Sequence, residues 1–285
     1  MKSPERGSVF FLTDYGGADE FAGVVRAVVA RHAPGAPLVD LTHAVPPFDV
    51  RAGALALERA APYLGPGVVL AVVDPGVGSQ RRAVAVERAA PSGPRHFVGP
   101  DNGLLPWALD VLGGTISVVA LARAPGAEPA EQVATASTEP SSSSRTFDGR
   151  DLFAPVVAGL WSGVPLRDIG SPVDVDSLVR LARPRLVVGA QGVEAEVQWV
   201  DGFGNAQLAA RPDDVGDAAA FLVVTRSTTC RAARVGTFAE LVEGELGVVE
   251  DANGHLALTC NRQAAATVLG VREGDVVTLK PVAGP

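Results

Sequence analysis

Short apolar runs alternate with amphipathic stretches along the first 180 residues of the chain. Apolar residues at helical spacing predict helices over residues 18–32, 50–61 and 151–160, and Pro62 ends the second of them. Shorter continuous runs predict buried strands over residues 9–12, 38–41, 68–73 and 83–86. A rhythm of strand, helix and strand is typical of a mostly parallel sheet with helices on both faces.

Polar and glycine-rich residues follow four of the apolar runs. These clusters are Thr13-Asp14, Thr42-His43, Asp74-Pro75-Gly76 and Pro100-Asp101-Asn102-Gly103. In open α/β sheets the ligand crevice lies beyond the carboxyl ends of the strands. Four such clusters are more than turn formation requires, so the sequence predicts a ligand site at that edge of the sheet.

The pattern changes after Arg183-Pro184, where the apolar runs become short and β-like with few helical stretches between them. These runs cover residues 186–188, 193–200, 221–225, 246–249, 256–260 and 276–279. They predict a small all-β barrel or sandwich. The predicted fold class is therefore α/β, with a mostly parallel domain over residues 1–182 and a smaller all-β domain over residues 183–285. Residues 122–145, rich in Ala, Pro, Glu and Ser, are expected to form a surface loop.

The acidic composition limits the partners to be expected. The 285 residues carry a net charge of −8, which argues against a nucleic-acid partner because a phosphate backbone needs a basic face. No stretch is long and apolar enough to span a membrane, and the first apolar run is too short for a signal peptide. The two cysteines, Cys230 and Cys260, are expected to be reduced in a cytoplasmic protein. Neither they nor the four scattered histidines have metal-ligand spacing, so no metal site is predicted.

Five segments combine carboxylates, glycines and aromatic residues in ways that suit a ligand site. They are residues 12–17, 73–78, 98–105, 146–155 and 200–205. Each also has an ordinary structural explanation, and for the last it is a hairpin turn with a buried Phe203. None of them matches a phosphate-binding loop, a zinc-binding helix or a nucleophile elbow.

Charged residues in two of the segments allow two interpretations each, and those of a third suit an ordinary helix cap. Asp14, with two glycines shortly after it, suits binding of a ribose diol, but it can equally cap the next helix. Arg81 lies seven positions after Asp74 and can either fold back to pair with it or stay solvated beside an ordinary turn. Asp151 and its neighbour Arg150 suit a charged helix cap.

In their order along the chain and in their residues, the five segments resemble motifs of the S-adenosylmethionine (SAM) hydroxide adenosyltransferase family and its relatives, the SAM-dependent fluorinases and chlorinases. The resemblance runs from Phe11 to about Leu279 and includes residues 41–43, 46–49 and 253–256. It implies a Rossmann-like N-terminal domain followed by a C-terminal β-barrel. It also implies a homotrimer that binds its small-molecule substrate, SAM, between the N-terminal domain of one subunit and the C-terminal domain of the next.

The resemblance assigns four residues to the adenosine half of SAM. Asp14 would accept hydrogen bonds from both ribose hydroxyls, and Phe48 would pack against the ribose or the adenine. Asn205 would contact the adenine or the ribose. Phe147 would form a wall of the site near the reacting carbon.

For the methionine half, the resemblance assigns Asp19 and Asp201 to the ammonium group. Residues Ala252 and Asn253 match the place where halogenases use Ser-Arg for the methionine carboxylate. Neither residue can supply that positive charge, so the resemblance leaves open how this chain holds the carboxylate.

The hydrolase branch of the family is marked by an Asp and an Arg in the second segment and a His in the fourth, which together handle the attacking water. Asp74 and Arg81 match this pattern, whereas halogenases have an uncharged or Tyr-type residue in place of the Asp. A fixed carboxylate beside the nucleophile would repel a halide. The resemblance therefore favours attack of water on the ribose 5′-carbon, giving adenosine and methionine with no metal or cofactor beyond the substrate.

Asp148 departs from the family, since it stands where hydrolases have His and halogenases have Tyr. Asp148 can replace that His as a base or water-orienting group, Asp74 and Arg81 can suffice alone, or the activity can be lost or changed. If Asp74 and Asp148 form a buried pair, they would share one proton or have a raised pKa, unless Arg81 or Arg150 compensates their charge. The alternatives to hydrolysis are thus a SAM-dependent halogenase forming 5′-halo-5′-deoxyadenosine, and a SAM- or adenosine-binding protein without turnover.

Overall fold

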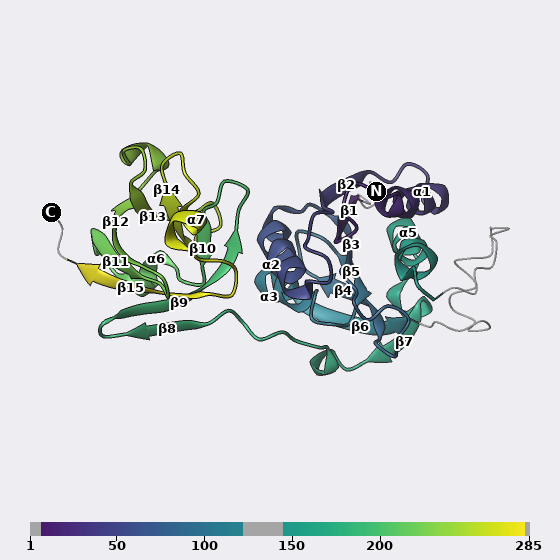
Figure 1. Cartoon of the computed structure of the whole chain (residues 1–285). Coiled ribbons are helices and arrows are strands. Elements are labelled where there is room, and N and C mark those ends of the chain that lie inside the picture. The colour runs from purple at the N-terminus through teal and green to yellow at the C-terminus, as the bar shows by residue number, and fades with distance from the viewer. Residues whose placement is uncertain (1–6, 122–144, 283–285) are drawn as a thin grey trace. The chain divides into compact units, whose positions relative to one another are not determined.

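The computed structural model describes residues 7–121 and 145–282, and the chain divides into two compact units, Met1–Leu181 and Ala182–Pro285 (Figure 1). Apart from Arg145, the loop predicted over residues 122–145 lies outside the described residues. Among the helices of the described residues, none is long and apolar enough to cross a membrane.

The first unit is built on a seven-stranded sheet with the strand order β2-β1-β3-β5-β4-β6-β7. Its strands are β1 (Ser8–Thr13), β2 (Leu38–Thr42), β3 (Gly67–Val72), β4 (Ala83–Ala89), β5 (His96–Pro100), β6 (Thr115–Leu121) and β7 (Gly170–Val173). Strands β2, β1, β3 and β5 are mutually parallel. Because β4 is antiparallel to both β5 and β6, and β7 is antiparallel to β6, five of the seven strands point in one direction. The sheet is mixed, and most of it runs parallel.

Helices cover both faces of this sheet. The α-helices are α1 (Phe21–His32), α2 (Val50–Ala60), α3 (Pro106–Leu112) and α5 (Ala154–Ser162). Single turns of 3₁₀-helix, which are η1 (Ala61–Tyr63), η3 (Leu166–Asp168) and η4 (Val175–Ser177), and the π-helix η2 (Gly149–Phe153) complete the unit. Helices α2 and α3 pack on one face, and α1 and α5 on the other (Figure 1).

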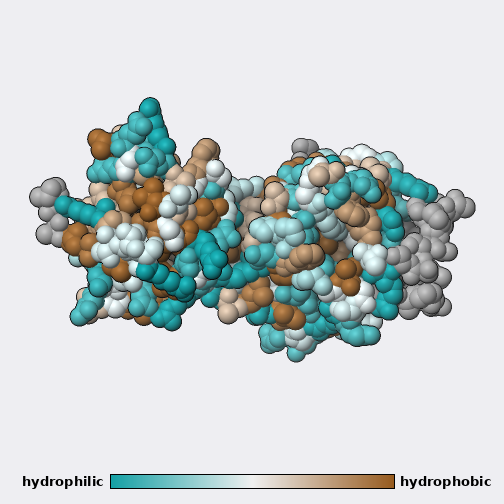
Figure 2. Space-filling model, viewed as in Figure 1, coloured by the Kyte–Doolittle hydropathy of each residue, from teal (hydrophilic) through white to brown (hydrophobic). Residues whose placement is uncertain are grey.

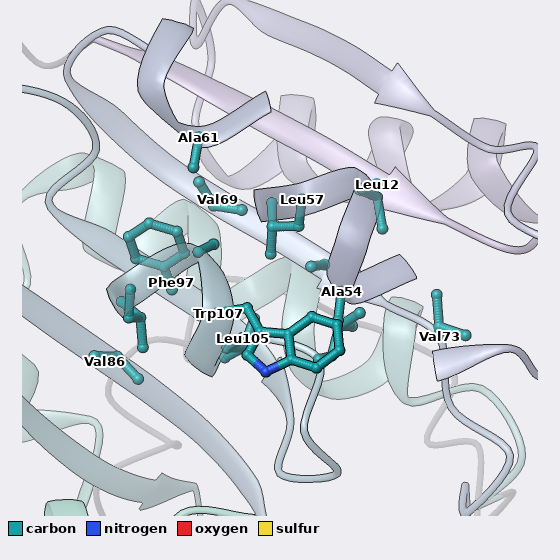
Figure 3. Close-up of a cluster of buried hydrophobic side chains, with 14 of the residues drawn as sticks. Leu12, Ala54, Leu57, Ala61, Val69, Val73, Val86, Phe97, Leu105 and Trp107 are labelled. Atoms are coloured by element: carbon teal, nitrogen blue, oxygen red, sulfur yellow. The ribbon is translucent and has the colours of Figure 1, made fainter. Parts of the chain in front are cut away.

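The strand period of two divides the core of the first unit into two clusters. In strand β1, Phe10 and Leu12 face α2 and α3, whereas Val9 and Phe11 face α1 and α5. Trp107 of α3 is fully buried in the first cluster among aliphatic side chains (Figure 3). Burial on both faces explains why these strands are continuous apolar runs in the sequence.

Three strands and one helix of this unit are absent from the prediction, namely β5, β6, β7 and α3. Strand β5 ends in Gly99-Pro100, and β7 contains Pro172, so neither has the apolar continuity of a buried strand. The helix predicted over residues 18–32 begins only at Phe21, because the residues before it form a turn. The helix predicted from residue 151 begins as η2 and becomes α-helical at Ala154.

The second unit is a closed barrel. Its sheet has the order β10-β14-β13-β12-β11-β15-β9-β8, and β10 also pairs with β9, so seven strands close on themselves and β8 lies outside the ring beside β9. The strands are β8 (Leu186–Gly189), β9 (Gly192–Val200), β10 (Ala206–Leu208), β11 (Ala220–Val224), β12 (Thr229–Val235), β13 (Leu246–Glu250), β14 (Leu256–Cys260) and β15 (Val276–Val282). Short helices α6 (Pro212–Val215), η5 (Phe238–Glu240) and α7 (Ala265–Leu269) connect them. The prediction of an α/β domain followed by a smaller all-β barrel is confirmed.

Arg88 ties the β4–β5 hairpin to the end of α3. Its side chain is almost fully buried and donates hydrogen bonds to the carbonyl oxygens of Ser92, Pro94 (3.3 Å), Leu112 (3.2 Å) and Gly113 (3.1 Å). A guanidinium suits this role because its donors are arranged in a rigid, planar fork.

We expect Arg88→Leu to lower the free energy of unfolding by about 2–4 kcal/mol, because it leaves one buried and three partly buried carbonyl groups without their donor. The measurement is urea unfolding of both variants followed by far-ultraviolet circular dichroism. Arg95→Leu is the matched control, since the Arg95 side chain, just before β5, is 70% exposed and pairs with Glu87. Its loss should stay below about 1 kcal/mol, and equal losses for the two variants would contradict the role of Arg88.

Candidate active site

The four polar clusters expected at strand ends lie along one edge of the first sheet. They follow β2, β1, β3 and β5, which are neighbours in the sheet and mutually parallel, so their carboxyl ends meet at the same edge. Asn102, after β5, donates from its side chain to the carbonyl oxygen of Val73, after β3, at 2.8 Å. The clusters are therefore linked into one surface.

A cavity of about 410 Å³ opens at this edge. Six residues that the sequence singles out line it, and these are Asp14, Asp19, Phe48, Asp74, Phe147 and Asp148. A seventh, Arg81, contacts two of them from behind. The remaining two, Asp201 and Asn205, belong to the second unit.

Arg81 joins the two carboxylates of the cavity. Its Nε donates to Asp74 Oδ1 at 2.8 Å, while its Nη2 donates to Asp74 Oδ2 and, at 2.5 Å, to Asp148 Oδ2. The side chains of Arg81 and Asp148 are each 10% exposed and that of Asp74 is 6% exposed. A solvated Arg81 beside an ordinary turn is thereby excluded. One guanidinium therefore binds both carboxyl groups at the cavity wall.

The π-helix η2 sets the position of Asp148, the residue that immediately precedes it. In η2 the Ala154 N–H bonds the Gly149 carbonyl, five residues back, and such wide turns are frequent at functional sites. Arg150 pairs with Asp151 at 2.5 Å and lies 5.1 Å from the centre of the Phe147 ring. The pairing expected of Arg150 and Asp151 is thus present, and Arg81 is the cation shared by Asp74 and Asp148.

Tyr15 is a wall of the cavity that the sequence prediction does not include. Burial raises the pKa of Tyr15 above its ordinary value, and the charges of Asp14 and Asp74 raise it further. The hydroxyl therefore stays protonated and available as a donor. A Cβ atom at Gly149 would lie 2.2 Å from this hydroxyl, so only glycine allows the approach. The sequence shows an aromatic residue two positions after Thr13, but it does not show that this side chain packs into the cavity wall.

Tyr15 also belongs to an aromatic cluster with Phe21 and Phe147. The ring centres of Tyr15 and Phe147 are 5.8 Å apart, and those of Phe21 and Phe147 are 5.2 Å apart, both edge to face. All three residues line the cavity beside the carboxylates. Aromatic faces next to anions suit a cation that carries apolar substituents.

Asp14 does not cap the helix after it. One of its oxygens accepts the Phe48 backbone N–H at 2.9 Å, and the first turn of α1 has no side-chain cap. Phe48 adopts a left-handed backbone conformation, with a φ of 70°, and its side chain is 72% exposed at the cavity. A bulky residue rarely adopts this conformation, which persists at sites where the surrounding structure imposes it. The loop after β2 is thus fixed against the loop after β1.

In the second unit, Asp201 and Asn205 form a compact turn at a separate cavity of about 1040 Å³. Asp201 Oδ1 accepts the backbone N–H groups of Phe203 and Asn205, each at 2.9 Å, and Oδ2 accepts the Asn205 side-chain amide at 2.8 Å. Asn205 Oδ1 in turn accepts the Thr259 hydroxyl at 2.7 Å. The expected hairpin turn is present, but Phe203 is 85% exposed, so a buried Phe203 is wrong.

The wall of this second cavity is largely apolar. Phe203, Phe238 and Trp199 line it together with residues of β13 and β14. Figure 2 shows hydrophobic residues gathered over the part of the barrel where β13, β14 and α7 lie. Ala252 and Asn253 line it as well, and the Asn253 backbone N–H donates to Asp251 Oδ1 at 2.8 Å. An apolar wall interrupted by a few fixed polar groups is typical of a small-molecule site.

Within the ranges that the structure covers, no group of three or more His, Cys, Asp or Glu side chains is placed to hold a metal ion.

A mixed α/β sheet with a charged cavity at its carboxyl edge, followed by a closed seven-stranded barrel, defines a two-domain α/β-plus-barrel protein. Residues 9–170 match the SAM hydroxide adenosyltransferase N-terminal domain, and residues 195–278 match the C-terminal domain of the same family. The chain therefore belongs to the SAM hydroxide adenosyltransferase family.

Relatives are similar to the chain over nearly its whole length. A protein of Salinispora tropica is 44% identical over 94% of this chain and 95% of its own length, and a protein of Thermus thermophilus is 41% identical over 95% and 98%. Both are named (R)-S-adenosyl-L-methionine hydrolase. A fluorinase of an Actinoplanes species is 25% identical over 95% and 96%. The crystal structure of an uncharacterized conserved protein of Thermotoga maritima superimposes with a TM-score of 0.83 at 34% identity, covering 95% and 99%.

The contact between Gly149 and Tyr15 is directly testable. We expect Gly149→Ala to lower the free energy of unfolding by about 1–3 kcal/mol, because the added methyl group must displace the Tyr15 hydroxyl. Tyr15→Phe in the same chain should recover a large part of that loss. A double-mutant cycle of thermal unfolding measures the coupling, and additive losses would show that the two residues are not in contact.

Proposed function

We propose that this protein hydrolyses SAM by directing water onto the ribose 5′-carbon, which gives adenosine and L-methionine. The observation that carries the proposal is the buried group of Asp74, Arg81 and Asp148 at the cavity wall. The hydrolase names of relatives at 41–44% identity support the same reaction. Because those names specify the R configuration at sulfur, the R epimer of SAM is the first substrate to test.

The reaction requires mainly positioning. The oxygen–C5′ bond forms as the C5′–sulfur bond breaks, and the electron pair of the broken bond neutralises the sulfonium to give the thioether of methionine. The leaving group therefore needs no protonation, and one proton of the attacking water passes to a carboxylate or to solvent. The protein has to hold the water in line with the C5′–sulfur bond and exclude other nucleophiles.

Asp74 is suited to orient the attacking water. Arg81 binds both of its oxygens, which fixes the plane of the carboxylate while leaving lone pairs on each oxygen. A carboxylate that accepts a hydrogen bond from the water stabilises the positive charge that the water acquires during attack. In this proposal Asp74 is the principal water acceptor.

Asp148 takes the place of the family His as a second acceptor. It shares the Arg81 Nη2 group with Asp74 and lines the same cavity, so it is placed to bind the same water. The charge of Arg81 compensates one of the two carboxylates, which allows both to stand at low exposure. The geometry thus supports the first of the three interpretations of Asp148.

The charge of the cavity distinguishes water from a halide as nucleophile. Asp14, Asp19, Asp74 and Asp148 face one cavity, with Arg81 behind two of them. This acidic wall attracts the sulfonium and ammonium charges of SAM and repels an anion. Hydrolysis is therefore favoured over halide transfer.

The substrate contacts of the proposal divide between the two units. In the first, Asp14 holds the ribose diol, Asp19 the ammonium group, and Phe48 and Phe147 wall the reacting carbon. In the second, Asp201 contributes to the ammonium and Asn205 to the adenine or ribose.

We further propose a homotrimer in which the second unit of a neighbouring subunit completes each site, in line with the family resemblance. The reaction as proposed uses no metal or cofactor. A cytoplasmic location is supported by two free thiols, Cys230 and Cys260.

Turnover of purified protein tests the proposal. Each SAM epimer is incubated with and without chloride, and the products are separated by liquid chromatography. We expect adenosine and methionine in both buffers. Asp74→Asn should lower kcat by about 100-fold or more, and Asp148→Asn by about 10-fold. Asp110→Asn, which alters an exposed pair with Arg180, is the matched control and should leave kcat unchanged. A 5′-chloro product, or SAM binding without any product, would overturn the hydrolase assignment.

The acidic, aromatic cavity should also discriminate by charge at sulfur. S-adenosylhomocysteine has a neutral thioether in place of the sulfonium. We expect it to bind at least about 10-fold more weakly than SAM, because it loses the attraction of the carboxylates and the aromatic faces. The inhibition constant of S-adenosylhomocysteine and the KM of SAM are compared in the native protein, whose cavity carboxylates are intact. Equal affinities would show that the sulfonium does not lie in this cavity.

A further inference from the structure

A chain of polar side chains lies behind the Asp14 loop, away from the cavity residues assigned above. Thr13 Oγ1 lies 2.8 Å from His43 Nδ1, and Asp40 Oδ1 lies 3.0 Å from His43 Nε2. Asp40 in turn accepts hydrogen bonds from Arg26, with Nε at 3.0 Å and Nη2 at 2.8 Å. The series runs from a partly exposed ion pair to Thr13, which is fully buried at the end of β1.

His43 contacts the loop that carries Asp14 from two directions. Its carbonyl oxygen accepts the Gly16 backbone N–H at 2.7 Å, just after Asp14 and Tyr15. Its ring contacts Thr13, whose hydroxyl oxygen accepts the Tyr15 backbone N–H at 3.1 Å. The edge-to-face contact with Phe11, with ring centres 4.7 Å apart, holds the imidazole in place.

Both nitrogens of the His43 ring lie close to polar side chains. Thr13 accepts a bond from the Tyr15 backbone, and its hydroxyl hydrogen can donate to His43 Nδ1. On the other side of the ring, Nε2 lies 3.0 Å from Asp40 Oδ1. Burial opposes the ionisation of Asp40, but its hydrogen bonds to His43 and Arg26 hold the pKa of that carboxyl below its ordinary value. The ring of His43 is thus held between Thr13 on one side and Asp40 on the other.

We propose that His43 is a positioning residue that, through Thr13 and Gly16, fixes Asp14 for binding of the ribose diol without contacting the substrate. This inference rests on the proposed function only in that Asp14 binds the ribose. It explains why His43 follows β2 at the same sheet edge as the proposed catalytic carboxylates. It also gives the buried hydroxyl of Thr13, at the end of an apolar strand, a role in holding the Asp14 loop.

The experiment compares the affinities of adenosine and 2′-deoxyadenosine by calorimetry. Their ratio reports the hydrogen bond from the 2′-hydroxyl to Asp14, and it should be about 10-fold or more in the native protein. Thr13→Val keeps the side-chain shape and removes the hydroxyl, and His43→Leu removes the ring nitrogens. Both should bring the ratio close to one. His43→Asn places an amide oxygen near the Nδ1 position and should preserve most of the ratio.

The controls separate positioning from folding and from the proposed function. Thr115→Val makes the same substitution at an exposed strand end and should leave the ratio at its native value. An unchanged ratio in Thr13→Val and in His43→Leu, with both proteins folded by circular dichroism, would overturn the positioning role. Equal binding of the two nucleosides by the native protein would instead contradict the assignment of Asp14 to the ribose and remove the basis of the inference.

Discussion

The active-site arrangement of this protein depends on one guanidinium shared by two buried carboxylates. Asp74 follows β3, and Asp148 stands at the start of η2, 67 residues beyond Arg81. Two carboxylates at such low exposure would each lose the solvation of their charge, and an uncompensated buried charge is strongly destabilising. Arg81 makes their proximity possible, so the same contact that joins the sheet edge to the helix also brings two carboxylates to one wall of the cavity.

The loops around this group are held by contacts that leave little room for change. Phe48 donates its backbone N–H to Asp14, and Tyr15 occupies the space that any side chain at Gly149 would need. Thr13 and His43 hold the same Asp14 loop from behind. Because β2, β1 and β3 are adjacent and parallel, their following loops converge, and each can act as a support for the next. Rigid support of this kind is what a reaction limited by positioning requires.

The cavities of the two units are lined by different kinds of residues. In the first, charge dominates, because carboxylates and a guanidinium stand at a sheet edge. In the second, Phe203, Phe238 and Trp199 provide apolar surface, and the fixed turn of Asp201 and Asn205 provides the polar groups.

The amino-acid sequence by itself determined the alternation of strands and helices, the change to a β-barrel and the polar clusters after β1, β2, β3 and β5, because these features depend on local periodicity and turn chemistry. It also contained the ordered motifs that place the chain in its family. Only the tertiary structure decided that Arg81 is shared with Asp148, that Tyr15 packs against Gly149 and that Phe203 is exposed. Strands β5, β6 and β7 likewise became visible only through their partners in the sheet. In each case the deciding contact joins residues distant in the chain, and neither periodicity nor the spacing of motifs carries information about the solvent exposure that such contacts produce.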